Sequence, residues 1–316
     1  MSFSSQIKEE LSLTKTGADH CRMAETAAII TMCGGVQIGS DESLTLKIHT
    51  ENRFVAARYC RLLAKAFQIR PLPGVRIGAS SCLYSLGICD HHQVYRVLYG
   101  THLLTDDGEI EEIMDEEKDP VLRRDCCRRA YLRGAFLVAG SVSDPRKHYH
   151  LEITCPSPEK AEKLRRLAEG FDLSPGVVER KGRYVFYLKE GDQISSMLGL
   201  MGASKSLMEM ENVRILRDIS NNVNRRVNCD AANIGKTVKT AQRQIEDIRF
   251  LREHTDITKL PAALLQMAQV RLEYPELPLL ELGQQLDPPL GKSGVNHRLS
   301  KLSQMAQELR ERMPES

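Results

Sequence analysis

The chain contains an internal repeat, which restricts the possible folds to those built from two similar halves. Matching segments recur 104 to 106 residues apart. The first copy contains AAIITMCGGVQIG, LTLKIHT and RFVAARYCRLLAKAF, and the second contains RGAFLVAGSVSD, YHLEITC and KAEKLRRLAEGF. Each copy reads as an apolar helix ending in glycine, two strands, a second helix and a further strand. One αββαβ unit has too little core to be stable alone, so we expect the two units to pack together.

This repeat predicts a pseudo-two-fold α+β domain over residues 1–202, with its copies at about 21–100 and 126–202. We expect residues 203–220 to be a linker and residues 221–316 to form an all-α domain. The evidence for the second domain is apolar residues in helical steps of four and three. Two such series are Ile234, Val238, Ala241, Ile245 and Ile248, and then Val295, Leu299, Leu302, Ala306 and Leu309.

A helix-turn-helix is predicted at about residues 278–309. A short helix marked by Leu279, Leu282 and Leu286 is followed by a Pro/Gly turn over 287–291 and then by a longer helix. In such motifs the second helix enters the major groove of duplex DNA. Its polar face predicts these DNA contacts: Lys292, Ser293, Asn296, His297, Arg298, Ser300, Lys301 and Gln304. The N-terminal part of such a helix usually contacts the bases, so base readout is expected from Lys292, Ser293, Asn296 and His297. The alternative is an ordinary amphipathic helix with a solvated polar face.

Charge is distributed unevenly along a chain whose net charge is only +2. Nine acidic residues and one lysine lie between Asp106 and Asp119, whereas residues 221–259 hold eight Lys or Arg and five acids. Isolated charge runs are usually solvated faces. Beside a recognition helix, however, cations can contact phosphates. We therefore expect further DNA contacts from Asn224, Arg225, Arg226, Lys236, Lys239 and Arg243.

Histidine and cysteine residues form two local groups, but neither has the spacing of a zinc site. The groups are Cys82, Cys89, His91 and His92, and then His148, His150 and Cys155. Neither contains CxxC or HExxH, so no metal is predicted. Cys126 and Cys127 are adjacent and are expected to be buried free thiols. Walker, GxSxG and Rossmann patterns are also absent from the sequence, so neither a cofactor nor a catalytic residue is predicted.

The composition favours a protein of the reducing cytoplasm. Nine cysteines without a disulfide framework fit that compartment. The first residues, MSFSSQIKEELSLTK, carry charges where a signal peptide has an apolar run. No apolar tract approaches the roughly 20 residues of a membrane span. We expect a cytoplasmic, nucleoid-associated protein that binds double-stranded DNA and no membrane; the sequence leaves the oligomeric state open.

Longer strings resemble a known family. The string CCRRAYLRGAFLVAGSVSDPRKHYHLEI resembles the LAGLIDADG motif of homing endonucleases with its following hairpin. The strings NRRVNCDAANIGKTVKTAQRQIEDI and LGQQLDPPLGKSGVNHRLSKL are similar to those of the WhiA family of Gram-positive bacteria. This resemblance implies a LAGLIDADG-like domain tethered to a helix-turn-helix. It also implies a role in transcription at sporulation, or in cell division and chromosome segregation.

One departure from the nuclease pattern bears on enzymatic activity. Homing endonucleases carry a metal-binding acid just before the glycine that ends each LAGLIDADG helix, but here Cys33 and Ala139 precede Gly34 and Gly140. Neither side chain offers the hard oxygen ligand that Mg²⁺ requires, so we expect no nuclease activity. Asp144 is expected to be a turn residue. The N-terminal domain is then expected to bind other regulatory proteins or to contact DNA weakly.

Two rival hypotheses remain. One is an active metal-dependent LAGLIDADG endonuclease, and the other is a protein-interaction adaptor with a vestigial helix-turn-helix.

Overall fold

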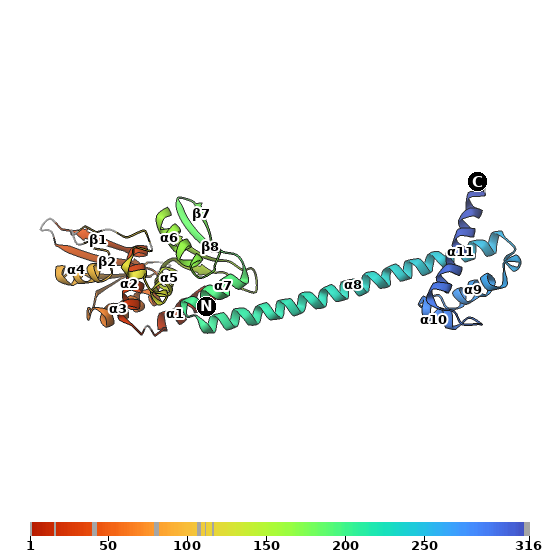
Figure 1. The fold of residues 1–316 in the computed structure, drawn as a ribbon, viewed down its shortest axis with the longest axis horizontal. Coiled ribbons are helices and arrows are strands. Elements are labelled where there is room, and N and C mark those ends of the chain that lie inside the picture. Colours follow the sequence, from red (N-terminus) through yellow and green to blue (C-terminus); the bar gives the residue numbers. More distant parts are fainter. Residues whose placement is uncertain are drawn as a thin grey trace. The chain divides into compact units, whose positions relative to one another are not determined.

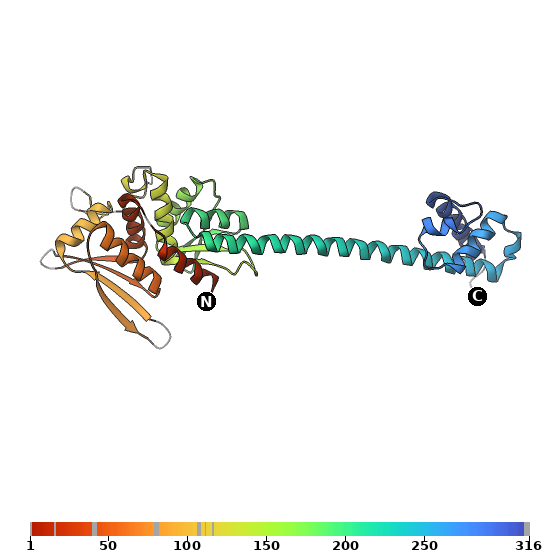
Figure 2. The ribbon, with the colours of Figure 1, turned by 90° about the horizontal axis from the view of Figure 1, so that it is seen from below.

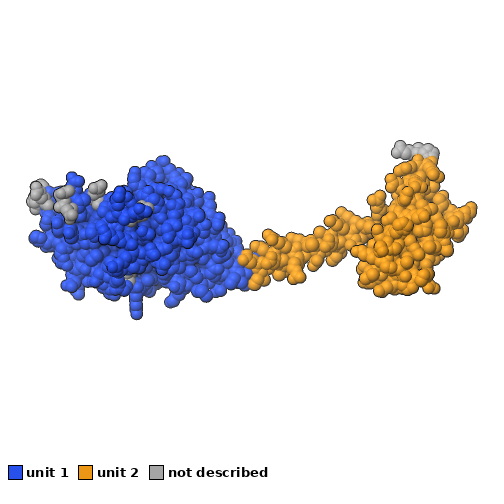
Figure 3. All heavy atoms as spheres, in the orientation of Figure 1, with its two compact units in different colours: residues 1–217 blue, residues 218–316 orange. Residues whose placement is uncertain are grey.

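The computed structural model describes residues 2–15, 17–39, 43–78, 82–105, 109–110, 112–115 and 117–312. The chain divides into two compact units, residues 1–217 and residues 218–316 (Figure 3). The first unit contains two antiparallel sheets with helices, and the second is entirely helical in its described part. This arrangement confirms the predicted α+β class followed by an all-α region.

The first repeat follows a short N-terminal helix, α1 (Phe3–Leu13) (Figure 1). Its elements are α2 (Asp19–Cys33), β1 (Gly34–Ile38), β2 (Leu44–Thr50), α3 (Arg53–Ala66), β3 (Leu72–Ile77), β4 (Cys82–Ile88) and α4 (His91–Gly100). The four strands form one sheet in the order β1-β2-β4-β3, with every neighbouring pair antiparallel.

The second repeat begins after the short 3₁₀ helix η1 (Pro120–Leu122) and has the same element order. Its elements are α5 (Asp125–Ala139), β5 (Gly140–Val142), β6 (Leu151–Cys155), α6 (Pro158–Glu169), β7 (Gly176–Arg180), β8 (Arg183–Leu188) and α7 (Gly191–Met201). The sheet order β5-β6-β8-β7 matches that of the first repeat. Each repeat is therefore αββαββα, with one more strand and one more helix than the αββαβ pattern expected from the sequence. The strand β3 was missed because its sequence, LPGVRI, contains Pro and Gly and is exposed at every position.

The first helices of the two repeats, α2 and α5, pack directly against each other. Small residues permit the close approach, because a methyl group at Gly134 would lie 2.7 Å from the Glu25 carbonyl oxygen and 2.8 Å from Ala28 Cβ. Apolar residues of both helices are buried, including Ile29 and Phe136, neither of which is measurably exposed. The two halves thus meet mainly through this helix pair, and their sheets are separate.

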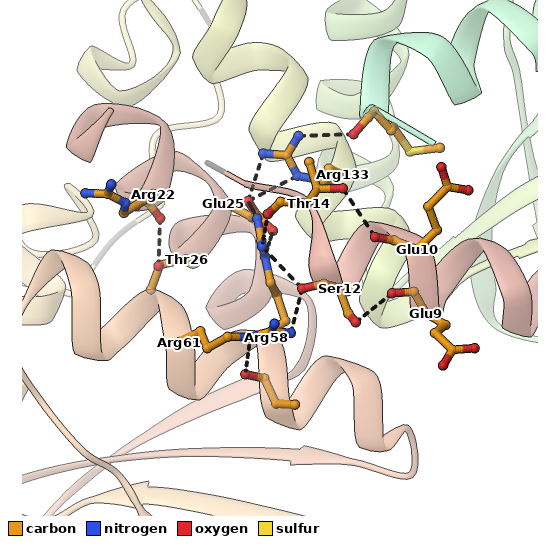
Figure 4. A network of polar contacts seen from close by, with 12 residues as sticks. Glu9, Glu10, Ser12, Thr14, Arg22, Glu25, Thr26, Arg58, Arg61 and Arg133 are labelled. Atoms are coloured by element: carbon orange, nitrogen blue, oxygen red, sulfur yellow. Dashed lines mark hydrogen bonds and ion pairs between the residues drawn. The ribbon is translucent and has the colours of Figure 1, made fainter. Parts of the chain in front are cut away.

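A buried ionic network also joins the repeats (Figure 4). The Glu25 carboxylate on α2 accepts from Arg58 of α3, with Nε–Oε1 and Nη2–Oε2 distances of 2.6 and 2.7 Å. The same carboxylate accepts from Arg133 of α5, whose Nη2 lies 2.9 Å from Oε2. Arg133 also donates to the Met201 carbonyl oxygen at the end of α7. Burial would raise the pKa of Glu25, but the hydrogen bonds and charges of the two arginines outweigh it and hold that pKa below its usual range.

The acidic segment between the repeats has a structural role in its described part. Asp119 lies 3.0 Å from the buried ammonium group of Lys163 on α6, and Glu112 pairs with Lys160 at 3.3 Å. Lys163 also donates to the Ile113 carbonyl oxygen at 2.6 Å. At least part of this acidic run therefore compensates buried cations instead of forming a solvated face.

The second unit is built from the end of a long helix and three shorter ones. These are α8 (Ser204–His254), α9 (Ala262–Glu273), α10 (Leu279–Gln284) and α11 (Lys292–Arg312), with the 3₁₀ helix η2 (Ile257–Lys259) between α8 and α9. In Figure 2 the blue helices gather around the C-terminal end of α8. Residues 203–220, expected as a linker, lie almost entirely within α8 and are helical. Helix formers such as Leu207, Met208 and Glu209 favour that conformation.

Candidate nucleic-acid interface

Helices α10 and α11 and the turn between them form the helix-turn-helix. The turn folds back on α10, because the Leu290 backbone N–H donates to the Gly283 carbonyl oxygen at 3.0 Å. A Cβ atom at Gly283 would lie 2.1 Å from the Leu290 carbonyl oxygen, so only glycine allows this approach. Leu282 and Leu286 are buried beneath the turn. The local sequence therefore fixes the angle at which α11 leaves α10.

One face of α11 holds the helix to the unit and leaves the opposite face exposed. Val295, Leu299, Leu302 and Ala306 are buried in the core of the second unit. Near its C-terminus, Arg310 Nη1 lies 2.7 Å from Oδ1 of the buried Asp247 on α8. Packing and this ion pair both restrict rotation of α11 about its axis.

The residues predicted to contact DNA lie largely on the exposed face of α11. Seven of the eight are exposed: Lys292, Ser293, Asn296, His297, Ser300, Lys301 and Gln304. The eighth, Arg298, is half-buried and its Nη1 lies 3.4 Å from the Ala263 carbonyl oxygen on α9. Gln304 donates within the helix to Glu308. The N-terminal half of α11 thus presents donors, acceptors and cations side by side.

A cavity joins the start of α11 to the neighbouring face of α8. It has a volume of about 460 Å³, and both Lys236 of α8 and Lys292 of α11 line it. Two lysines more than fifty residues apart in sequence are therefore brought together beside the first turn of α11. Thr237 and Thr240 line the same cavity. The sequence pattern did not indicate these threonines, although they follow Lys236 by one and four positions on a helix.

The other predicted residues of α8 are exposed but lie at different distances from α11. Lys239 and Arg243 follow Lys236 at helical steps of three and four, so they share its side of α8. Asn224, Arg225 and Arg226 lie in a part of α8 that is exposed at every position from 221 to 240. At about 1.5 Å per residue, Arg226 is roughly 15 Å along the helix from Lys236. The structure therefore places Lys236 beside the start of α11, with Lys239 and Arg243 on the same side of α8, and leaves the first group farther along the helix.

In the first unit, the helix ends that would carry nuclease acids hold other groups. Cys33 ends α2 and its Sγ donates to the Ile29 carbonyl oxygen at 3.3 Å, while Ala139 ends α5. Burial raises the pKa of the Cys33 thiol to about 12. Asp144 occupies the turn after β5, where its carboxylate accepts from the Arg146 backbone N–H at 2.9 Å.

In the described residues, neither local His/Cys group of the sequence brings three ligand atoms close together. His91 Nδ1 accepts from the Leu44 backbone N–H, and His150 pairs with Glu152 at 3.2 Å. Within the same described residues, no helix has both the length and the apolar character needed to cross a membrane.

The chain is similar to known proteins over nearly its whole length. Three family models match: the WhiA N-terminal LAGLIDADG-like domain over residues 19–76, the WhiA LAGLIDADG-like domain over 128–220, and the WhiA C-terminal HTH domain over 223–306. A probable cell division protein WhiA from Lachnoclostridium phytofermentans is 44% identical, covering 98% of this chain and all of that protein. Its counterpart from Alkaliphilus metalliredigens is 42% identical, covering 97% and 98%.

Solved structures show the same fold. The crystal structure of full-length WhiA from Thermatoga maritima superposes with a TM-score of 0.60 at 24% identity, covering 98% of this chain and 99% of the other. The N-terminal LAGLIDADG domain of a WhiA protein superposes with a TM-score of 0.50, covering 67% of this chain and 96% of the other.

Proposed function

The chain belongs to the WhiA family, and on that basis we propose that it is a sequence-specific DNA-binding regulator. Its helical unit binds double-stranded DNA, and its doubled N-terminal unit contributes regulation through other proteins. The curated relatives are named as probable cell division proteins, which supports a role in cell division. A role in chromosome segregation is part of the same proposal. As a DNA-binding regulator, the protein would control transcription, including transcription at sporulation. It would do so in the cytoplasm, at the nucleoid.

The exposed face of α11 is the observation that carries this proposal. A recognition helix needs its apolar face held by the domain and its polar face turned to solvent at the N-terminal end. Val295 and Leu299 are buried, while Asn296 and His297 beside them are exposed. An asparagine side chain can pair with the N6 and N7 groups of adenine in the major groove.

Phosphate contacts are assigned to the cations around this face. Lys292 and Lys301 lie on α11, and Lys236, Lys239 and Arg243 lie on the neighbouring side of α8. Such contacts position the protein on any duplex and supply most of the salt-dependent affinity. Arg298 is assigned a smaller part, because its guanidinium group already lies close to α9.

Two lysine substitutions test the phosphate assignment. The double variant Lys292→Ala/Lys301→Ala should weaken binding to every duplex and lower the slope of log K against log salt by about 2, since each lost phosphate contact removes about 0.9. Fluorescence anisotropy over a salt series measures both quantities. A matched variant of exposed cations in the first unit, Lys65→Ala/Arg70→Ala, should bind as the parent does. Equal affinity in all three proteins would refute the assignment.

Base readout is tested separately, by Asn296→Ala and His297→Ala. Each should lower the preference for the genomic target over random duplex by about tenfold, because one good base contact contributes about 1–3 kcal/mol. Binding to random duplex should change little. Selection from a random DNA pool with the parent and each variant measures the preference, and an unchanged preference would contradict the readout role.

We also propose that the LAGLIDADG-like unit has no nuclease activity. Its helix ends carry Cys33 and Ala139 in place of oxygen ligands, and the nearby Asp144 is engaged in a turn. Supercoiled plasmid incubated with pure protein and Mg²⁺ or Mn²⁺ should stay intact. Cleavage that disappears on substituting one acid of the first unit would instead support the enzyme hypothesis.

A further inference from the structure

The N-termini of α2 and α5 carry a repeated pair of potential metal ligands. The sequence is Asp-His-Cys-Arg at residues 19–22 and Asp-Cys-Cys-Arg at residues 125–128. His20 and Cys126 are 106 residues apart, and Cys21 and Cys127 have the same separation, so the pairs occupy equivalent positions in the two repeats. Because α2 and α5 pack together, these two pairs face each other.

The four side chains converge on one point. His20 Nδ1 lies 3.1 Å from Cys127 Sγ, 3.3 Å from Cys21 Sγ and 3.9 Å from Cys126 Sγ. All four potential ligand atoms lie within 4.8 Å of one another. In tetrahedral zinc sites, with Zn–S near 2.3 Å and Zn–N near 2.0 Å, ligand atoms are about 3.5 to 3.8 Å apart. Shifts of about 1 Å or less therefore suffice to seat an ion: His20 Nδ1 moves slightly away from Cys21 and Cys127, and the more widely separated ligand atoms move closer.

We propose that His20, Cys21, Cys126 and Cys127 bind a structural Zn²⁺ ion that joins the two repeats. Three thiolates and one imidazole are a usual ligand set for tetrahedral structural zinc, and soft sulfur ligands disfavour Mg²⁺ and Ca²⁺. The site holds two ligands from each repeat. It therefore cross-links the helix pair that forms the centre of the first unit.

The surroundings of the cluster suit such an ion. Cys21 and Cys127 are buried and His20 is half-buried, whereas Cys126 is exposed and leaves a route from solvent. The expectation that both adjacent cysteines are buried is therefore wrong for Cys126, which is exposed, and confirmed for Cys127. The thiols sit in the first turns of two 15-residue helices, where the helix dipoles favour thiolates. Zinc binds the thiolate form of cysteine, so binding releases the thiol protons.

One contact has to change when zinc binds. Arg124 Nη1 lies 3.0 Å from His20 Nε2, which makes Nε2 an acceptor and places the proton on Nδ1. Coordination through Nδ1 moves the imidazole proton to Nε2, so the Arg124 guanidinium must turn away. Arg124 is exposed and can do so, and its positive charge then remains near a site whose net charge with three thiolates is −1.

Metal content tests the proposal. Full-length protein purified without chelators should contain one zinc ion per chain by elemental analysis. Replacement by Co²⁺ should give the intense visible absorption of tetrahedral, thiolate-bound cobalt. Cys126→Ser is the first variant, because its side chain is exposed and the fold should survive, as circular dichroism can verify. It should lose most of the bound metal, as should Cys127→Ser.

The control is Cys89→Ser, which removes an exposed cysteine outside the cluster and should retain the full metal content. Thiol titration of the native protein gives an independent readout, since zinc should protect three thiols that a chelator exposes. Absence of bound metal after Zn²⁺ titration of the reduced protein would overturn the proposal. So would a disulfide between Cys21 and either Cys126 or Cys127 in protein that binds no zinc, or unchanged metal content in both serine variants.

Discussion

Glu25 is a buried acid that compensates charge in both repeats. Its carboxylate receives one guanidinium group from each repeat, Arg58 from the first and Arg133 from the second. Breaking a buried ion pair by removing one partner costs about 3–5 kcal/mol, because the other charge stays buried. Glu25→Gln, which keeps the shape of the side chain, should therefore lower the free energy of unfolding of the first unit by that amount.

The pH dependence supplies a second readout of the same substitution. The pKa of Glu25 is held below its ordinary value of 4.5, so ionised Glu25 stabilises the fold above that pH. This stabilisation is lost as the pH falls through the lowered pKa of the folded state. Urea unfolding should show a parent–variant gap that is full at pH 7 and narrows well below pH 4.5. A pH-independent gap would contradict the electrostatic origin, and the exposed control Glu169→Gln should show little effect at any pH.

The turn between α10 and α11 is the element that orients the recognition helix. Gly283→Ala places a methyl group 2.1 Å from the Leu290 carbonyl oxygen, so the turn or α10 must move. We expect a loss of about 1–3 kcal/mol from the second unit and weakened DNA binding. Gly235→Ala on α8 meets no atom within 4 Å and should stabilise its helix by about 1 kcal/mol. Thermal unfolding and anisotropy measure both effects; equal behaviour of the two variants would refute the role of the turn.

The sequence predicted those helices and strands in which buried apolar residues recur at regular steps. The α11 helix was predicted because Val295, Leu299, Leu302 and Ala306 are buried at regular steps. The strand β3 was not, because none of its residues is buried. The extent of α8 was also missed, since Ile219, Val223 and Val227 are exposed apolar residues that mark no core face.

The two candidate sites also differ in how well the sequence could predict them. The exposed residues of α11 follow one another on a single helix, so local spacing predicted them. The His20 cluster draws its two halves from positions 106 residues apart. No local spacing motif contains both halves, and the expectation of no metal rested on local spacing alone. The duplicated Asp-His-Cys-Arg and Asp-Cys-Cys-Arg strings were the available signal, because repeat symmetry brings equivalent helix ends together.

At the scale of the whole molecule, the two units have separate cores. The apolar clusters of residues 1–217 and of residues 218–316 share no member among the described residues. Multi-domain chains of this kind need not unfold as one cooperative unit. We therefore expect two transitions by calorimetry of the full chain. Glu25→Gln should lower only one of them and Gly283→Ala only the other.

The double variant Glu25→Gln/Gly283→Ala shows whether the two units unfold independently or are coupled. If the cores unfold separately, its two midpoints should equal those of the corresponding single variants, because distant sites without shared partners have additive effects. Gly283→Ala should lower its own midpoint by roughly 5 to 20 °C, given about 4–8 °C per kcal/mol in a unit of this size. DNA at saturating concentration should raise the transition that Gly283→Ala lowers and leave the other in place. Coincident shifts of both transitions would mean that α8 transmits stability between the units, and DNA binding by the helical unit would then act on the LAGLIDADG-like unit directly.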